Sequence, residues 1–196
     1  MKKIVLASAS PRRVELLKQI KLEFEIFPSS VGEQIDMITK PEEMVQQLAY
    51  KKAVDVAGKL NCAQNGENTL VIGADTIVVK DGIMGKPKNE AHAFEMLKRL
   101  QGEWHEVMTG VAVVNAQDMK YIVDYEKTRV KFRNLSDEII NSYIKTGEPM
   151  DKAGAYGVQG IGAVLVERME GCYFNVVGLP LVKLAKLLES FDVKIL

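Results

Sequence analysis

The sequence predicts a mixed α/β fold in which a sheet of parallel and antiparallel strands is flanked by helices. Apolar runs of strand length alternate along the chain with stretches whose apolar residues recur at helical spacing. Hairpin signals at Asp81-Gly82 and Glu170-Gly171 join neighbouring runs without a helical crossover, so a purely parallel sheet is excluded. With 196 residues, 47% of them hydrophobic, the chain can build one sizeable core, and we expect a single domain over residues 1–196.

The N-terminal part predicts a strand, a helix and a second strand. Residues 3–7 form a short apolar run, and residues 24–28 form another. Between them we expect a helix over residues 11–20, because Ser10 can cap its N-terminus and Pro11 suits the first turn.

A polar loop, a long helix and the strongest strand signal follow. The loop covers residues 29–40, and the helix covers residues 41–59, where apolar side chains recur every three or four residues. After a second polar loop over residues 61–68, the apolar run over residues 69–79 predicts a strand. The Asp81-Gly82 pair then predicts a tight hairpin.

The middle of the chain alternates between helix and strand. It predicts, in order, a helix over residues 89–100, strands over residues 105–115 and 120–132, and a helix over residues 136–146. Asn89 and Ser136 are suitable N-caps for the two helices, and Gly102 and Gly147 follow their expected ends.

The C-terminal part begins with a glycine-rich loop. In order, it predicts that loop over residues 154–162, a hairpin of strands over residues 163–169 and 173–177, a helix over residues 180–191 and a strand over residues 193–196. The glycines of the loop allow its backbone to approach another group closely.

Composition and charge exclude several classes of protein. Lys plus Arg and Asp plus Glu both number 26, and this zero net charge argues against a broad nucleic-acid-binding surface. Two cysteines and two histidines exclude a disulfide framework and a multi-histidine metal site. The apolar stretch over residues 4–7 is too short for a signal peptide, and no apolar run reaches the ~20 residues of a membrane span. We therefore expect a cytoplasmic protein that contacts no membrane.

The segment Ser8-Ala9-Ser10-Pro11-Arg12-Arg13 predicts an anion site. It leads from a strand into a helix N-terminus, where free backbone N–H groups and the helix dipole attract negative charge. Two arginines in the first turn work against the dipole, but their guanidinium groups suit phosphate oxygens. The alternative is that Ser10 only caps the helix while both arginines are solvated. We favour the anion site.

A second polar constellation is centred on Asp75, which interrupts the apolar run over residues 69–79. An unpaired carboxylate there is costly in free energy. Asp75 therefore either takes part in the chemistry of a site or has a structural role, in a turn, in a cap or in an ion pair with a buried lysine. Lys86 follows the hairpin in Gly85-Lys86-Pro87 and can return toward Asp75. On local grounds Glu33, in a polar loop, and Lys52, on a helix, are each expected to be solvated.

The motifs of several enzyme classes are missing. The sequence has no Walker GxxxxGK[ST] motif, no GxGxxG dinucleotide motif and no GxSxG nucleophile elbow. His92 and His105 have no serine or cysteine partner in a motif and are expected to be structural. The remaining carboxylates, lysines and arginines indicate metal-assisted attack of water on a phosphate. Mg²⁺ suits this chemistry because it prefers oxygen ligands.

Six segments spread over nearly the whole chain form a specific set. They are Ser8-Ala9-Ser10-Pro11-Arg12-Arg13, Gly73-Ala74-Asp75-Thr76, Gly85-Lys86-Pro87, Thr109-Gly110-Val111, the run over residues 147–160, and Asn175-Val176-Val177-Gly178-Leu179-Pro180. In this order they resemble the motifs of the Maf family. The resemblance implies a nucleoside triphosphate pyrophosphatase that cleaves between the α and β phosphates, giving a nucleoside monophosphate and pyrophosphate, with dTTP and UTP as substrates.

The resemblance also implies a divalent cation, Mg²⁺ with Mn²⁺ as the alternative. The implied fold is an elongated mixed sheet with a deep cleft between two lobes, similar to inosine triphosphate pyrophosphatases. Members of the family are often dimeric, so a homodimer is expected. The family was first linked to inhibition of septum formation.

Individual residues match the family's functional positions. Ser8, Arg12 and Arg13 match its phosphate-contacting loop, Asp75 its proton acceptor, Thr76 the position typical of the dTTP and UTP subgroup, Lys86 the lysine of its Gly-Lys-Pro motif, and Gln159 the glutamine of its glycine-rich loop. Lys52 and Glu33 match by position, and Asp75 and Glu33 are the implied metal ligands. The chain departs from the family at Gly32 and Lys51, where an acid is common.

Two other functions are alternatives. One is a pyrophosphatase for modified or purine nucleotides, and the other is a non-catalytic nucleotide-sensing protein of cell division. The combination of Asp75 with Lys86 favours an enzyme, because a sensor needs a basic phosphate site but no base.

Overall fold

The computed structural model describes residues 2–32, 40–63 and 66–196, and Glu33 lies outside these ranges. In the described residues the helices are α1 (Pro11–Gln19), α2 (Pro41–Cys62), α3 (Glu90–Leu100), α4 (Asp137–Ile144), α5 (Tyr173–Val177) and α6 (Leu181–Glu189). The strands are β1 (Lys3–Leu6), β2 (Glu25–Ile26), β3 (Thr69–Val79), β4 (Ile83–Met84), β5 (Trp104–Asn115), β6 (Tyr121–Phe132) and β7 (Val166–Glu170). No helix in these ranges is long and apolar enough to cross a membrane.

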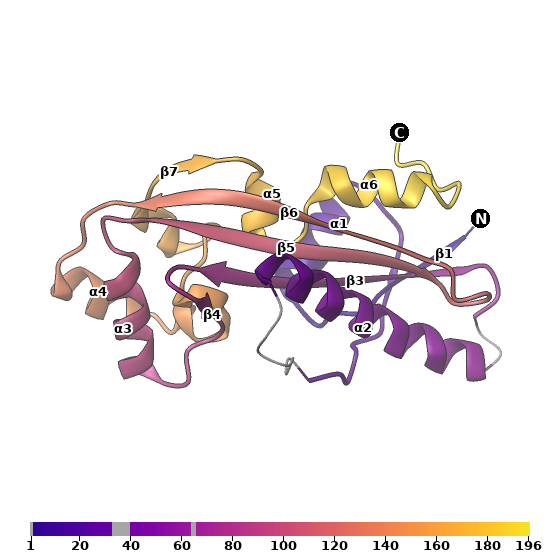
Figure 1. Cartoon of the computed structure of the whole chain (residues 1–196), viewed down its shortest axis with the longest axis horizontal. Helices are drawn as coiled ribbons and strands as arrows, with labels where there is room; N and C mark the ends of the chain where they lie inside the picture. The colour runs from indigo at the N-terminus through magenta and orange to yellow at the C-terminus, as the bar shows by residue number, and fades with distance from the viewer. Residues whose placement is uncertain (1, 33–39, 64–65) are drawn as a thin grey trace. The chain divides into compact units, whose positions relative to one another are not determined.

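The strands of the described residues form one mixed sheet. Their order is β2-β1-β3-β5-β6-β7, and β4 pairs with β3 outside this path. β1 pairs in parallel with β2 and with β3, whereas β3 pairs with β4, and β6 with β7, in antiparallel fashion. The long strands β3, β5 and β6 can be followed in Figure 1. The predicted mixed α/β class is therefore confirmed.

The chain forms two compact units. The first contains Met1–Asp75, Thr109–Glu126 and Gly178–Leu196, and the second contains Thr76–Met108 and Lys127–Val177. Three of the four boundaries between them fall within β3, β5 and β6, which contribute residues to both units, and the fourth follows α5, between Val177 and Gly178. The single domain over residues 1–196 stays a prediction.

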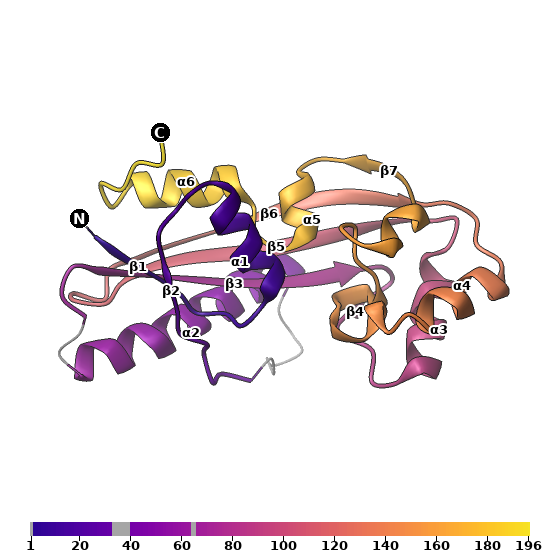
Figure 2. The same cartoon turned by 180° about the vertical axis from the view of Figure 1, so that it is seen from behind.

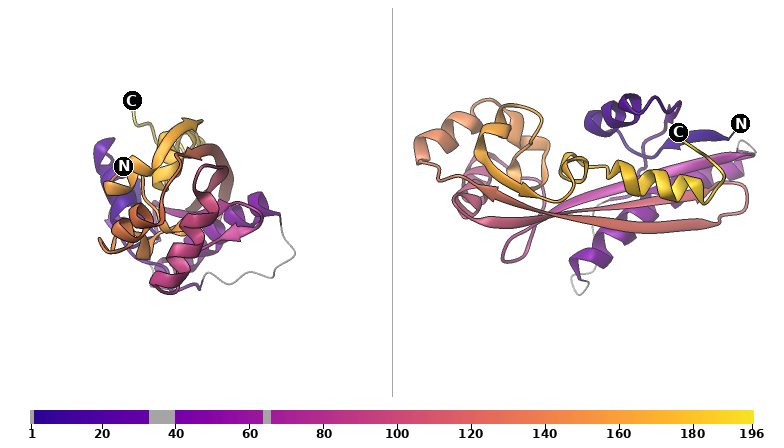
Figure 3. Two further views of the ribbon diagram at one scale, coloured as in Figure 1. Left: turned by 90° about the vertical axis from the view of Figure 1, so that its left-hand side faces the viewer. Right: turned by 90° about the horizontal axis from the view of Figure 1, so that it is seen from above.

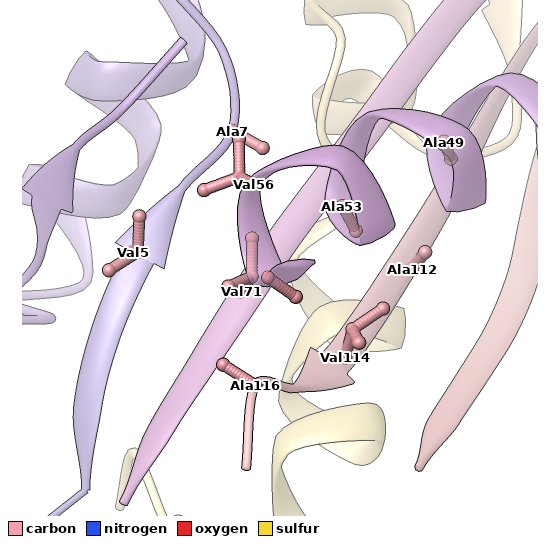
Figure 4. Packing of buried hydrophobic residues seen from close by; sticks show 10 residues of the cluster. Val5, Ala7, Ala49, Ala53, Val56, Val71, Ala112, Val114 and Ala116 are labelled. Atoms are coloured by element: carbon pink, nitrogen blue, oxygen red, sulfur yellow. The ribbon is translucent and has the colours of Figure 1, made fainter. Parts of the chain in front are cut away.

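In the first unit, α2 packs a face of small apolar residues against β1, β3 and β5. Figure 4 shows this cluster, which consists of Val5, Ala7, Ala49, Ala53, Val56, Ala57, Val71, Ala112, Val114 and Ala116. The helix approaches the strands closely, since a Cβ atom at Gly73 would lie 2.2 Å from the carbonyl oxygen of Ala49. One at Gly110 would lie 2.1 Å from the carbonyl oxygen of Val45. The two glycines therefore fix the position of α2, which carries Lys52.

The other two helices of the first unit are α1 and α6. α1 connects the parallel strands β1 and β2, as Figure 2 shows. α6 lies on the opposite side of the first-unit strands from α2 (Figure 3), where Lys183 Nζ contacts Asp124 Oδ2 at 2.8 Å. Ser10 is the N-cap residue of α1, as predicted, but its side chain makes no cap hydrogen bond. The serine hydroxyl that acts here is Ser8 Oγ, which accepts from the Ser10 N–H at 3.2 Å.

The second unit confirms the predicted caps and hairpin. Asn89 Oδ1 accepts from the backbone N–H of His92 at 2.8 Å, and Ser136 Oγ accepts from that of Ile139 at 3.4 Å. β3 turns into β4 through Asp81-Gly82, where both residues have positive φ, 51° and 127°. A tight hairpin of this kind requires such angles, which glycine adopts without steric cost.

The predicted strand over residues 173–177 is wrong, because these residues form α5. A short apolar run does not by itself distinguish a strand from a buried helix, and tertiary contacts decide. Here Asn175 is fully buried, and its Nδ2 donates to the carbonyl oxygen of Val107 at 3.0 Å and to Thr128 Oγ1 at 2.9 Å. Helix α5 places this amide against β5 and β6, while β7 takes the strand position beside β6.

The predicted strand over residues 193–196 is also wrong. After α6 the backbone N–H of Val193 donates to the carbonyl oxygen of Leu188 at 3.0 Å, so this segment closes the end of the helix. Asp192, with a φ of 59°, makes the turn.

Candidate functional site

Ser8 and Arg13 form a buried polar pair where β1 leads into α1. Both are almost fully buried, with exposed fractions of 8% and 9%. Arg13 Nη1 donates to Ser8 Oγ at 3.0 Å, and Arg13 Nε donates to the carbonyl oxygen of Gly178 at 2.9 Å. These two bonds fix the plane of the guanidinium group.

This geometry overturns one sequence alternative, in which both arginines of the segment are solvated. Arg13 is buried and held, and Arg12 is half-buried one residue earlier in the same helical turn. The first turn of α1 contains no acidic residue. A fixed cationic group beside a helix N-terminus is suited to bind a phosphate.

Asp75 and Lys52 form a buried ion pair in the first unit. Lys52 Nζ on α2 lies 2.5 Å from Asp75 Oδ1 on β3, and the side chains are only 12% and 8% exposed. The local expectation that Lys52 is solvated is therefore wrong, since α2 packs this position against β3. The pair corresponds to the structural interpretation of Asp75 considered above. It is equally suited to chemistry, because it fixes a carboxylate in a site from which bulk water is largely removed.

The parallel pairing of β1 with β3 brings the Ser8–Arg13 pair and the Lys52–Asp75 pair near each other. Leu6 of β1 pairs with Ile72 of β3, and the N–H of Ala7 donates to the carbonyl oxygen of Ile72 at 2.8 Å. Ser8 therefore lies two residues past the carboxyl end of β1, and Asp75 lies three residues past Ile72, within β3. From the usual strand spacing and rise, their backbones lie within about 10 Å of each other. Ligands of open α/β sheets commonly bind beyond the carboxyl ends of the parallel strands.

Three predicted site residues belong to the second unit. Thr76 follows Asp75 on β3 and is half-buried, whereas Lys86 and Gln159 are exposed. The loop after β4 is tied to the glycine-rich loop (residues 154–162), because the Gly154 N–H donates to the carbonyl oxygen of Gly85 at 3.1 Å. The return of Lys86 toward Asp75 stays a prediction.

Sequence reasoning assigned no role to Glu148, which is the main acceptor for the glycine-rich loop. Its carboxylate accepts from the N–H groups of Ile161 at 2.9 Å and of Gly162 at 3.0 Å. The available signal was an acid shortly before a glycine-rich segment, whose N–H groups need acceptors when no regular ladder satisfies them.

Both histidines have structural surroundings. His105 is buried, its Nε2 lies 2.7 Å from the Tyr156 hydroxyl, and its ring meets Tyr156 and Phe132 edge-to-face. Burial, together with the charge of Lys80, lowers the pKa of His105 to about 4, so the ring is neutral near pH 7. His92 Nδ1 accepts from the N–H of Lys88 at 3.2 Å at the start of α3.

The side chains around Asp75 offer few ligands for the expected divalent cation. Among the described residues, no group of three or more His, Cys, Asp or Glu side chains could hold a metal ion. Mg²⁺ is usually held by one or two carboxylates, with phosphate oxygens and water completing its shell. Asp75 supplies a carboxylate of this kind beside the Ser8–Arg13 pair, so the residues fit a cation bound together with phosphate. Glu33, the second implied ligand, lies outside the described residues.

Comparison with known proteins gives consistent matches over the whole chain. The model of the family described as Maf-like protein matches residues 3–191. A dTTP/UTP pyrophosphatase of Acetivibrio thermocellus is 58% identical, and the alignment covers 100% of this chain and 98% of that protein. A dTTP/UTP pyrophosphatase of Caldicellulosiruptor bescii is 51% identical over 97% of this chain and 95% of that protein.

A comparison with solved structures matches the Ham1 protein of Staphylococcus aureus. The TM-score is 0.43 at 17% identity, and the match covers 84% of this chain and 80% of that chain.

Proposed function

The chain belongs to the Maf family, and from that membership we propose that it is a nucleoside triphosphate pyrophosphatase whose substrates are dTTP and UTP. It hydrolyses the bond between the α and β phosphates and releases a nucleoside monophosphate and pyrophosphate. The names of full-length relatives that are 58% and 51% identical support this activity. The structural observation that carries the proposal is the buried Lys52–Asp75 pair, which lies near the Ser8–Arg13 pair that follows the carboxyl end of β1.

Ser8, Arg12 and Arg13 bind the phosphate chain in this proposal. The bonds from Arg13 to Ser8 and to Gly178 orient the guanidinium before substrate arrives, so little conformational entropy is lost on binding. As the bond to pyrophosphate breaks, negative charge grows on the leaving group. Preorganised cations at that position lower the barrier, and Lys86 contributes a further positive charge.

Asp75 accepts a proton from the attacking water. The water oxygen bonds to a phosphorus atom beside the scissile bond, the bridging oxygen departs with its electron pair, and the water proton passes to the carboxylate. Lys52, 2.5 Å from Oδ1, holds the carboxylate in one orientation. A positioned general base of this kind contributes about 10²- to 10⁴-fold to a rate.

Gln159 and Thr76 recognise the pyrimidine base. Uracil and thymine present two carbonyl acceptors on either side of one N–H donor, and an amide side chain has both a donor and an acceptor. Gln159 is exposed on the glycine-rich loop, where it can meet a ligand. Thr76 follows Asp75 directly and connects base recognition with the catalytic strand.

Family membership implies a divalent cation. In this proposal the cation is Mg²⁺, with Mn²⁺ as the alternative, and its protein ligands are Asp75 and Glu33. When bound, it neutralises charge on the phosphate oxygens. We further propose a single domain over residues 1–196, a homodimer and a cytoplasmic location, with no nucleic-acid or membrane partner. An enzyme of nucleotide metabolism fits that compartment.

The direct test is product analysis with dTTP, UTP, GTP and ATP, each with and without Mg²⁺. We expect pyrophosphate and the monophosphate in equal amounts, with dTTP and UTP turned over fastest and only when the cation is present. Release of inorganic phosphate as the first product would contradict cleavage between the α and β phosphates. Tight binding of nucleotides without any turnover would support a nucleotide sensor.

A further inference from the structure

Glu148 is the point at which the glycine-rich loop is held. Both of its carboxylate oxygens accept backbone N–H groups of the loop, Oε2 from Ile161 at 2.9 Å and Oε1 from Gly162 at 3.0 Å. The Tyr143 hydroxyl donates to Oε1 at 2.9 Å. Three donors therefore converge on one side chain of the preceding turn.

The bonds hold the loop on both sides of Gln159. On one side the N–H of Gly157 donates to the Tyr143 hydroxyl at 3.2 Å, and on the other side Ile161 bonds to the carboxylate. Tyr143 itself is 3% exposed and belongs to the packed face of α4. Gln159, the residue proposed to recognise the base, thus lies between two backbone hydrogen bonds. Their acceptors, Tyr143 and Glu148, are themselves hydrogen-bonded to each other.

The loop also fits closely around this scaffold. A Cβ atom at Gly160 would lie 2.2 Å from Glu148 Oε2, and one at Gly162 would lie 2.5 Å from the Tyr143 hydroxyl. Side chains other than hydrogen at these positions would push the loop away from the carboxylate. Gly160 and Gly162, which follow Gln159, are therefore explained by contact with Glu148 and Tyr143.

The charge states suit these hydrogen bonds. Burial alone raises the pKa of Glu148, but the bonds from Gly162, Tyr143 and Ile161 outweigh it and lower the pKa below its usual value. Burial, more than the neighbouring acid, raises the pKa of Tyr143. Near neutral pH the carboxylate is ionised and the phenol is protonated, which gives a charge-assisted hydrogen bond.

We propose that Glu148 and Tyr143 are positioning residues that fix Gln159 and thereby set the preference for pyrimidine over purine nucleotides. The proposal rests on the base-recognition role that the proposed function gives to Gln159. A site discriminates by leaving the polar groups of the wrong partner unpaired, which requires its own donor and acceptor to be held in place. A loop released from Glu148 keeps Gln159 but loses that fixed geometry.

The test compares kcat/KM for dTTP and GTP in four single variants and in the double variant Glu148→Gln/Gln159→Ala. Glu148→Gln keeps the size of the side chain but replaces one acceptor oxygen with an NH₂ group, which faces the N–H donors. Tyr143→Phe keeps the buried ring and removes the hydrogen bond from the Gly157 N–H and the hydrogen bond to Glu148 Oε1. Gln159→Ala tests the reading residue itself, and Glu167→Gln, at an exposed position of β7, is the matched control.

We expect Glu148→Gln to lower the ratio of kcat/KM for dTTP to that for GTP on the order of tenfold, since hydrogen bonds to a charged group are lost. Most of the loss is expected in KM for dTTP. Tyr143→Phe lowers the ratio less, and Glu167→Gln leaves it unchanged. Combining Glu148→Gln with Gln159→Ala adds little to Gln159→Ala alone, because both act through one contact.

A drop in the ratio for Gln159→Ala but none for Glu148→Gln or Tyr143→Phe overturns the positioning role and leaves base recognition intact. A drop for Glu148→Gln but none for Gln159→Ala overturns the proposal that Glu148 acts through Gln159, and it also removes Gln159 as the reading residue. No drop in any variant overturns both. Tyr143→Phe keeps the question answerable if Glu148→Gln does not fold.

Discussion

The buried pair of Lys52 and Asp75 makes a quantitative prediction about stability. Lys52→Met keeps an unbranched side chain on α2 but removes the ammonium that lies 2.5 Å from Asp75 Oδ1. The two side chains are 12% and 8% exposed, so solvent screens the remaining carboxylate little. Removing one partner of such a pair costs about 3 kcal/mol in the free energy of unfolding. For a chain of this size that corresponds to a Tm lower by about 6–12 °C.

The double variant Lys52→Met/Asp75→Asn separates stability from activity. The double variant removes both charges of the pair, so no unpaired carboxylate stays buried. We therefore expect it to recover at least half of the stability that Lys52→Met loses. It is nevertheless expected to be inactive, because the proposed base is gone. The assay is thermal unfolding of the single and double variants, with pyrophosphate release measured on the same samples.

An exposed pair provides a matched control. Lys98 and Asp137 are also 2.5 Å apart, but their side chains are 48% and 55% exposed. Lys98→Met is therefore expected to cost no more than about 1 kcal/mol. If Lys52→Met changes the Tm no more than Lys98→Met does, or if the losses in the double variant simply add, the buried-pair reasoning is refuted.

Three further predictions concern the phosphate site, the packing of α2 and the pH dependence of stability. Arg13→Ala and Lys86→Ala are each expected to lower kcat/KM for dTTP on the order of 10²-fold, by analogy with a lost oxyanion donor; values equal to wild type would identify solvated charges. Gly110→Ala places a methyl group against the α2 backbone and is expected to cost about 1–3 kcal/mol by urea unfolding, and an unchanged midpoint would contradict that contact. His105, whose pKa falls from 6.5 to about 4 on folding, binds a proton more readily in the unfolded chain. Stability is therefore expected to fall as the pH decreases through that window, and unfolding of His105→Gln at pH 7 and pH 5 should show a weaker dependence than wild type.

Local sequence signals predicted most of the elements that they control. The strand over residues 69–79 and the cap at Asn89 were predicted correctly. Both depend on neighbouring residues, the strand on its run of apolar side chains and the cap on a hydrogen bond to a backbone N–H three residues away. Residues 173–177 were predicted wrongly as a strand. Their state depends on hydrogen bonds from Asn175 to β5 and β6, more than forty residues away in sequence.

The candidate site divides in the same way. The local pattern, and then the resemblance, selected Ser8, Arg13 and Asp75, and the structure holds each of them in a defined environment. Local reasoning placed Lys52 in solvent because its partner lies 23 residues away, across the contact between α2 and β3. Glu148 was missed because its hydrogen bonds to Ile161 and Gly162 form only when the glycine-rich loop has folded around it.

In the proposed mechanism, Asp75 activates the water that attacks the nucleotide and so releases pyrophosphate. The measurement is the steady-state rate of pyrophosphate release from dTTP by wild type and by Asp75→Asn, with Mg²⁺, at several pH values, on samples shown by circular dichroism to be folded. We predict that Asp75→Asn loses at least about 10²-fold in kcat, as expected for a missing general base. A folded Asp75→Asn variant that turns over dTTP at the wild-type rate across this pH series would contradict the account.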